Sequence, residues 1–184
     1  YTEGITKITA DDFVYAKAMG RSIKLLAMSK VTESGNMAMV TPCMISNENP
    51  LYMVNGVFNA VLVKGNMLGD SMYYGRGAGK LPTASAVVGD VIECARNQGR
   101  FLPCFWDQED VALADISELK RSFFVRASKE AKAALEEAFV GGQVIELDGR
   151  DDIGYVTLPV KEKDFASKYA ALGNTVYGRI RIED

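Results

Sequence analysis

The hydrophobic pattern first predicts a helix after Thr9. Apolar residues recur there at helical spacing, at Phe13, Ala16 and Met19. Asp12 stands three residues after Thr9, which is the spacing of a capping box, and Gly20 is the kind of residue that ends a helix. The pattern therefore indicates a helix that begins after Thr9 and ends before Gly20.

Mostly apolar runs after this helix predict four strands. The first two runs cover 22–30 and 36–41. Two further runs, 57–63 and 67–74, are separated by a Lys-Gly-Asn turn at 64–66, so we expect them to pair as a β-hairpin.

A second helix is expected over 82–97. Pro82 would be its first helical residue, where the missing N–H costs nothing because that position has no intrahelical acceptor. Its apolar side chains form one stripe at Val87, Val88, Val91, Ile92 and Ala95. We expect this stripe to be the buried side of the helix.

The character of the sequence changes between 99 and 119, where glycine, proline and acidic residues show little periodicity. We place a domain boundary there, which divides 1–118 from 119–184. The elements expected after it are a strand at 122–127, a helix at 129–139, strands at 143–147 and 154–160, a helix at 162–172 and a strand at 175–182. This βαββαβ order is the ferredoxin-like arrangement. The predicted fold is α+β, with a mixed sheet covered by helices in the first domain and a ferredoxin-like second domain.

Composition limits the possible chemistry. The 184 residues include no histidine, which excludes Ser-His and Cys-His nucleophile pairs and a His-ligated zinc within this chain. The three cysteines, Cys43, Cys94 and Cys104, have no metal-ligand spacing, so we expect free thiols and no metal site. A net charge of −3 without a basic run argues against a nucleic-acid surface, and no apolar run approaches the length of a membrane span.

The most informative run is YYGRGAGKLPTASAVVGDVIECAR at 73–96. Its glycines at 75, 77 and 79 let the backbone approach a ligand closely or adopt conformations that other residues resist. The helix that follows offers its N-terminus, which attracts anions and polar ligands. We interpret the run as a backbone-lined edge of a substrate or cofactor site, with a tight turn that binds nothing as the alternative.

Two nucleotide-binding motifs are excluded for this run. A P-loop needs four residues between its first glycine and the Gly-Lys-Ser/Thr end, but only three separate Gly75 from Gly79. Leu81 also stands where the hydroxyl residue of that motif would be. The dinucleotide motif GxGxxG fails because Leu81 and Pro82 follow Lys80.

Together with GRGAGKLPTASAVV, the blocks Glu3-Gly4-Ile5, ITADDFVYAKAMG and SIKLLA resemble the catalytic domain of homoserine dehydrogenases over residues 1 to about 100. That family has an N-terminal dinucleotide-binding domain, which this chain lacks, so the resemblance implies a fragment that begins just after it. An ACT domain, which has βαββαβ order, often follows the catalytic domain. Its Asp-x-Pro-Gly loop is absent here, because residues 126–129 read Arg-Ala-Ser-Lys.

The resemblance implies roles for five residues. Lys24 matches the lysine that protonates the carbonyl oxygen of the aldehyde and acts as general base in reverse; its apolar neighbours should lower its pKa. Glu3 matches a glutamate that contacts the substrate. Asp12 matches a substrate aspartate, although helix capping explains it equally. Gly77 and Gly79 would bring backbone close to the nicotinamide and the substrate.

This chain departs from the family in one pattern. The usual Asp-Pro-x-x-Asp followed by Asp-x-x-x-Lys is missing, since Gly20 stands four residues before Lys24. Judged by the residues alone, Lys24 would be a solvent-facing lysine of a strand, and Glu3 a solvated carboxylate near a chain end.

The implied reaction is the NAD(P)H-dependent interconversion of L-homoserine and L-aspartate 4-semialdehyde, which leads to threonine and methionine, in the cytoplasm. NADP or NAD would serve the complete enzyme, and we expect neither to bind this chain alone. We expect a homodimer, because family members pair through the sheet of this domain and the strands between 22 and 74 are too apolar for one layer of helix to cover. The alternatives are an amino-acid-sensing regulatory module and the substrate domain of another Rossmann-type oxidoreductase.

Overall fold

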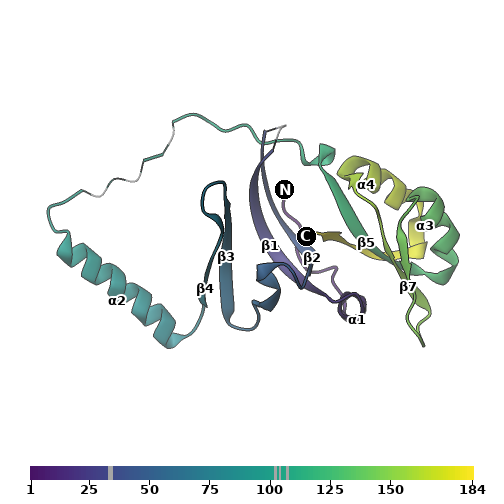
Figure 1. The fold of residues 1–184 in the computed structure, drawn as a ribbon, viewed down its shortest axis with the longest axis horizontal. Coiled ribbons are helices and arrows are strands. Elements are labelled where there is room, and N and C mark those ends of the chain that lie inside the picture. The colour runs from purple at the N-terminus through teal and green to yellow at the C-terminus, as the bar shows by residue number, and fades with distance from the viewer. Residues whose placement is uncertain (33–34, 102, 104, 107) are drawn as a thin grey trace. The chain divides into compact units, whose positions relative to one another are not determined.

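The computed structural model describes residues 1–32, 35–101, 103, 105–106 and 108–184, which form two compact units (Figure 1). Unit 1 contains residues 1–49 and 111–184, and unit 2 contains residues 50–110. The division into domains at residue 118 stays a prediction. Cys43 and Cys94 are free thiols, whereas Cys104 lies outside the described residues. None of the described helices is both long and apolar enough to cross a membrane.

Unit 1 begins with the predicted helix and two long strands. Helix α1 spans Ala10–Ala18, and the N–H of Thr9 donates to Asp12 Oδ2 at 2.7 Å, which is the reciprocal half of a capping box. Strands β1 (Arg21–Thr32) and β2 (Gly35–Ser46) pair antiparallel along their whole length. Both are longer than predicted, because backbone pairing continues through polar residues that break the apolar runs.

The second part of unit 1 has an element order close to the predicted βαββαβ, with one additional short strand, and the ferredoxin-like arrangement stays a prediction. Its elements are η2 (Ile116–Glu118), β5 (Lys120–Ser128), η3 (Lys129–Ala131), α3 (Lys132–Ala138), β6 (Gln143–Ile145), β7 (Asp152–Val156), β8 (Val160–Lys161), α4 (Glu162–Ala171), η4 (Gly173–Thr175) and β9 (Val176–Ile182). One predicted strand, 154–160, is divided between β7 and the short β8. The break follows Val156 and includes Pro159, which has no N–H to donate to a ladder.

These strands form one mixed sheet with the order β1-β2-β9-β5-β7-β6, and β8 pairs with β5. The sheet is antiparallel except between β2 and β9, which run parallel and pair at Cys43 with Arg181 and at Met44 with Ile182. A mixed sheet is thus confirmed, although it was predicted within residues 1–118 and its parallel pair includes β9. The sheet joins strands from both sides of residue 118.

Successive side chains of β5 point to opposite faces of the sheet, so the core is divided between the two faces. Phe123 and Val125 belong to a buried cluster with residues of α3 and α4, while Phe124 belongs to a second cluster with Tyr15 and Ala16 of α1. Figure 1 shows α3 and α4 together beside β5 and β7. Full burial of one such large apolar side chain contributes about 1.5–3 kcal/mol.

Unit 2 contains η1 (Pro50–Met53), β3 (Phe58–Gly65), β4 (Gly69–Arg76) and α2 (Lys80–Arg96). The predicted hairpin is confirmed, because β3 and β4 pair antiparallel and end opposite each other at Gly65 and Gly69. Helix α2 begins at Lys80 rather than at Pro82, so the proline is its third residue. The ring of Phe58 stacks on that of Tyr74 with centroids 4.8 Å apart.

The expectation that the apolar stripe of α2 is buried is wrong for this chain. Val87, Val88, Val91 and Ile92 are 45–61% exposed, and no residue of α2 is buried. Periodicity shows which face of a helix can be buried, but a partner surface must also be present. Among its described residues, unit 2 has a two-stranded sheet and no other strands, which is too little structure to cover the helix.

Candidate functional site

Lys24 lies on β1, directly opposite Cys43 of β2. Cys43 is fully buried, and burial raises the pKa of its thiol to about 12, so it is not a thiolate near neutral pH. Lys24 is half-buried, and burial lowers the pKa of its ammonium below the ordinary value. The environment expected from its apolar neighbours is therefore present.

Glu3 is held beside β2 and joined to two arginines of β9. Its N–H donates to the carbonyl of Val40 at 2.8 Å. Its Oε2 accepts hydrogen bonds from the Tyr1 hydroxyl at 3.0 Å, from Arg179 Nη1 at 3.3 Å, and from Arg181 Nη1. Burial alone would raise the pKa of Glu3, but the hydrogen bond and positive charge of Arg181 and the charge of Arg179 outweigh it, so the pKa is lowered. Glu3 is therefore an ion-paired carboxylate rather than a solvated one.

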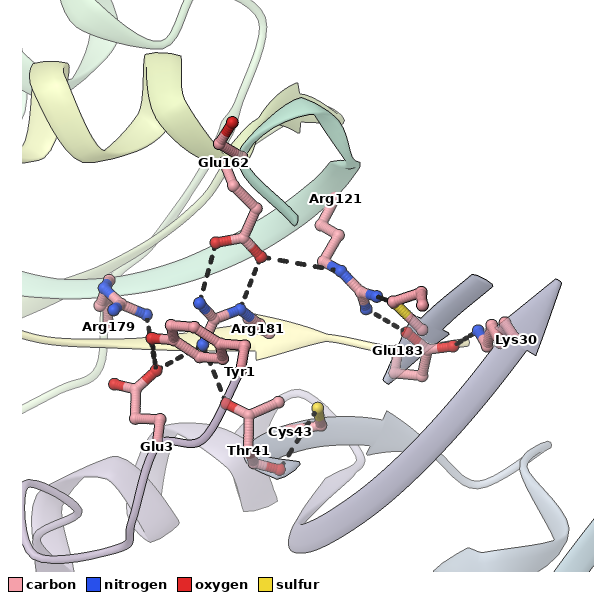
Figure 2. Close-up of polar contacts among 12 residues, drawn as sticks. Tyr1, Glu3, Lys30, Thr41, Cys43, Arg121, Glu162, Arg179, Arg181 and Glu183 are labelled. Atoms are coloured by element: carbon pink, nitrogen blue, oxygen red, sulfur yellow. Dashed lines mark hydrogen bonds and ion pairs between the residues drawn. The ribbon is translucent and has the colours of Figure 1, made fainter. Parts of the chain in front are cut away.

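Arg181 is the centre of this network (Figure 2). Its side chain is 2% exposed. Nε and Nη2 donate to the two carboxylate oxygens of Glu162 at 2.6 and 2.8 Å, and Nη1 donates to Thr41 Oγ1 at 2.9 Å as well as to Glu3. One guanidinium thus connects β9 to α4, β2 and the N-terminal segment.

The network continues to β1 through Arg121 and Glu183. Arg121 Nη1 donates to Glu183 Oε2 at 2.6 Å, and its Nε lies 3.7 Å from Glu162 Oε1. Glu183 also pairs with Lys30. Positive and negative groups therefore alternate through unit 1, in the order Lys30, Glu183, Arg121, Glu162, Arg181, Glu3 and Arg179. Alternation of this kind compensates charges that would be costly to bury singly.

Sequence reasoning missed Arg179, Arg181 and Glu162. A signal was present in β9, where Gly178, Ile180 and Ile182 take one face and the two arginines take the other. An arginine that is buried in a strand is almost always paired with a carboxylate, but the sequence does not show which carboxylate it pairs with.

Asp12 takes part in both capping and an ion pair. It is 2% exposed; Oδ2 accepts from the N–H of Thr9, and Oδ1 accepts from Arg126 Nε at 2.9 Å. Arg126 Nη1 also lies 3.2 Å from Asp152 Oδ2, and the Tyr15 hydroxyl donates to Asp152 Oδ1 at 2.8 Å. The carboxylate of Asp12 is thus engaged within the protein on both oxygens.

The two glycines have local structural roles in unit 2. A Cβ at Gly77 would lie 1.7 Å from Asn59 Nδ2, so the absent side chain makes room for Asn59. Gly79 directly precedes α2 with φ of +119°, a value that other residues rarely adopt. Lys24, Glu3 and Asp12 belong to unit 1, whereas Gly77 and Gly79 belong to unit 2.

The described residues of unit 2 do not fit a complete dinucleotide site. In dinucleotide-binding folds the glycine loop joins a strand of a parallel sheet to a helix. Here β4 pairs with β3 in an antiparallel hairpin, and Pro82 removes one N–H from the first turn of α2. These described residues of unit 2 therefore offer at most an edge of such a site. Within the described part of the chain, no group of three or more Cys, Asp or Glu side chains is placed to hold a metal ion.

Comparison with known proteins gives a consistent result. The family model for homoserine dehydrogenase matches residues 1–92. The homoserine dehydrogenase of Helicobacter pylori is 36% identical over 173 residues, which cover 94% of this chain and 40% of that protein. The enzyme of Pseudomonas aeruginosa is 48% identical over 96 residues, which cover 52% of this chain and 22% of that protein.

Solved structures agree. A homoserine dehydrogenase from Thiobacillus denitrificans matches with a TM-score of 0.80 and 30% identity over 99% of this chain and 47% of that one. The Staphylococcus aureus homoserine dehydrogenase at pH 7.0 matches with a TM-score of 0.71 and 26% identity. The chain spans less than half the length of these relatives. Because the family model covers half of the chain and the structural match extends over nearly all of it, the chain belongs to the homoserine dehydrogenase family.

Proposed function

We propose that this chain is the catalytic and C-terminal portion of an oxidoreductase that interconverts L-homoserine and L-aspartate 4-semialdehyde with NADP or NAD. The observation that carries the proposal is the family match over residues 1–92, together with structural similarity over 99% of the chain. The free thiols of Cys43 and Cys94 support a reducing compartment such as the cytoplasm.

Lys24 is the residue that we propose for proton transfer. As an ammonium it would donate a proton to the carbonyl oxygen of the aldehyde, and as a neutral amine it would accept the hydroxyl proton of the alcohol. Its half-buried position and lowered pKa support this role, because a general acid or base works best when its pKa lies near the working pH. Glu3 would contact the substrate ammonium as a carboxylate whose charge is already shared with Arg179 and Arg181. We keep Asp12 as a second substrate contact in this proposal, although its engaged oxygens favour the capping role.

Turnover by the complete protein tests the proposal. We expect oxidation of L-homoserine with a dinucleotide cofactor and no comparable oxidation of L-malate. Oxidation of malate without oxidation of homoserine would identify a different oxidoreductase. If neither is oxidised and threonine alone raises the melting temperature, the amino-acid-sensing module is the better interpretation.

The 184-residue chain should not bind NAD or NADP measurably on its own. The reason is that Gly77 and Gly79 supply only an edge next to an antiparallel hairpin. Isothermal titration calorimetry with each cofactor measures this directly. Micromolar affinity would show that the nucleotide site is complete within this chain.

The chain should form a symmetric dimer. Apolar side chains of β3 and β4 are exposed in the single chain, with Val61 at 62% and Tyr73 at 71%, and a two-fold interface would cover such side chains. We expect a dimeric mass in sedimentation equilibrium, and Val61→Glu should shift the equilibrium toward monomer. A monomeric mass for the unmodified chain at tens of micromolar contradicts the prediction.

We also propose that residues 119–184 form an ACT-like domain without the usual effector loop. The strand order β9-β5-β7-β6 with antiparallel neighbours supports the ferredoxin-like arrangement. At the expected loop position, Arg126 is instead paired with Asp12 and Asp152.

Threonine should therefore cause no saturable amide shifts at 126–131 in the isotope-labelled chain. The physical reason is that this segment leads from β5 directly into η3 and α3, with no Asp-x-Pro-Gly turn to present backbone N–H groups to a carboxylate. A titration followed by NMR decides the point, and saturable shifts confined to 126–131 would show that an effector site exists there.

A further inference from the structure

We propose that unit 1 contains a binding pocket for a small carboxylate, formed between the N-terminal segment, β2, α4 and β9. The pocket has a volume of about 240 Å³. Its lining includes the charged side chains of Glu3, Lys7 and Arg179. Only Glu3 is common to this pocket and the proposed reaction, so the proposal does not rest on the reaction.

The pocket has a structural origin in the sheet. Strands β2 and β9 pair at only two positions, Cys43 with Arg181 and Met44 with Ile182. The part of β2 that precedes Cys43 is hydrogen-bonded instead to the N-terminal segment, where the N–H of Glu3 donates to the carbonyl of Val40. Residues 177–179 of β9 are therefore not paired with β2, and the pocket lies beside this opening in the sheet.

The charges that line the pocket favour an anion. Lys7 and Arg179 carry two positive charges, and Glu3 carries the one negative charge among the lining residues. Glu3 shares that charge with Arg181, which is itself paired with Glu162 on two further contacts. The bond from Arg179 Nη1 to Glu3 is 3.3 Å long, longer than the roughly 2.7–2.9 Å of a strong charge-assisted bond. Arg179 is thus less fully compensated than Arg181, and a ligand carboxylate would complete its pairing.

The remaining walls favour a small ligand with a short carbon chain. Ile8 and Pro42 are apolar, and Tyr169 and Tyr177 contribute aromatic side chains that carry hydroxyl groups. Each ring has a neighbour that favours one position: Tyr169 stacks on Phe165 with centroids 5.5 Å apart, and the guanidinium of Arg126 lies 5.5 Å from the ring centroid of Tyr177, which is 50% exposed. A pre-arranged pocket loses little freedom on binding. Its volume lies below the roughly 300–1,000 Å³ of pockets for drug-sized ligands, so a short dicarboxylate or an amino acid matches it better.

Succinate and L-aspartate are the probes that test the pocket. They have the same carbon chain and differ by one ammonium group. Each is titrated into the isotope-labelled 184-residue chain at constant ionic strength, with sodium chloride as the reference salt. We expect saturable amide shifts at residues 3–8 and 177–179. Tighter binding of L-aspartate would show in addition that its ammonium meets Glu3.

Variants separate a carboxylate site from a general salt effect. Arg179→Gln should weaken binding at least about tenfold, the effect of losing one charge-assisted contact, and Arg179→Lys should weaken it less because the charge remains. Lys17→Gln, which changes an exposed lysine of α1 outside the pocket, should leave binding unchanged. Unchanged unfolding midpoints show that the variants are folded.

Two results would overturn the proposal: the absence of saturable shifts with both probes, or equal affinity of Arg179→Gln and the unmodified chain. In the complete enzyme, competition between the bound probe and L-homoserine would identify the pocket as part of the substrate site. Binding without competition would identify a separate ligand. Either result supports the pocket. Binding of the probes can be measured even if the complete protein does not turn over homoserine.

Discussion

Lys24→Ala in the complete enzyme should lower kcat by about 10²- to 10⁴-fold, the range for loss of a positioned acid or base, with a much smaller change in KM. The side chain is half-buried on β1 opposite the buried Cys43, so water does not replace it easily. Its lowered pKa means that more of it is neutral near the working pH than for an exposed lysine. Steady-state kinetics in both directions measures the effect.

Two controls make this result specific. Lys17→Ala changes an exposed lysine of α1 and should leave kcat unchanged. Lys24→Arg keeps the positive charge but does not release a proton near neutral pH, so it should be nearly as impaired as Lys24→Ala. In the oxidation direction the unmodified enzyme should show a rate that rises as pH increases through the pKa of Lys24, because in the proposed mechanism the neutral amine is the base. Near-normal kcat in Lys24→Ala would remove Lys24 from the mechanism.

Local signals in the sequence predicted local structure well. Thr9 and Asp12 stand at capping distance, and the capping hydrogen bond is present at the start of α1. The hairpin of β3 and β4 followed from a Lys-Gly-Asn turn between two apolar runs. In each case the residues that decide the structure lie within a few positions of one another, so pattern and outcome are closely linked.

Long-range partners could not be predicted in this way. Nothing in the sequence shows that β2 pairs with β9, which brings residues 43 and 181 side by side in one sheet. The stripe of α2 was recognised correctly as apolar, but whether it is buried depends on a partner surface that packs against it. An amphipathic pattern specifies a face and not the partner of that face.

The same limit applies to the candidate site. Lys24 was expected to be desolvated from its immediate neighbours, and it is. The pairing of Glu3 with two arginines of β9 depends on residues more than 170 positions away, as the separations of 176 and 178 show. The sequence therefore indicated the carboxylate but not the guanidinium groups that hold its charge.

Arg181→Met should lower the free energy of unfolding by about 3–5 kcal/mol, the usual cost of removing one partner from a buried ion pair. Methionine replaces the apolar stem of the arginine but not its guanidinium, so the loss comes mainly from Glu162 and Glu3, which would stay in place without their principal cation. Urea unfolding followed by far-UV circular dichroism measures the change. Arg21→Met is the matched control, because its pair with Asp184 is more exposed and should contribute about 1 kcal/mol or less.

The pH dependence of stability gives a second test of the same network. The pKa of Glu3 is lowered in the folded protein, so the stability that it contributes is present above its unfolded pKa and is lost as pH falls through the folded pKa. Without Arg181, its hydrogen bond and its positive charge no longer lower the pKa of Glu3, so that pKa should be higher than in the unmodified chain. The acid-side loss of stability in Arg181→Met should therefore begin at a higher pH than in the unmodified chain.

A double variant distinguishes a paired charge from simple loss of packing. Once Arg181 is replaced, Glu162→Gln removes one uncompensated charge, so it should cost less in the Arg181→Met background than in the unmodified chain. If the two substitutions are additive, and Arg181→Met costs no more than Arg21→Met, then Arg181 is not the group that holds Glu3 and Glu162 in place.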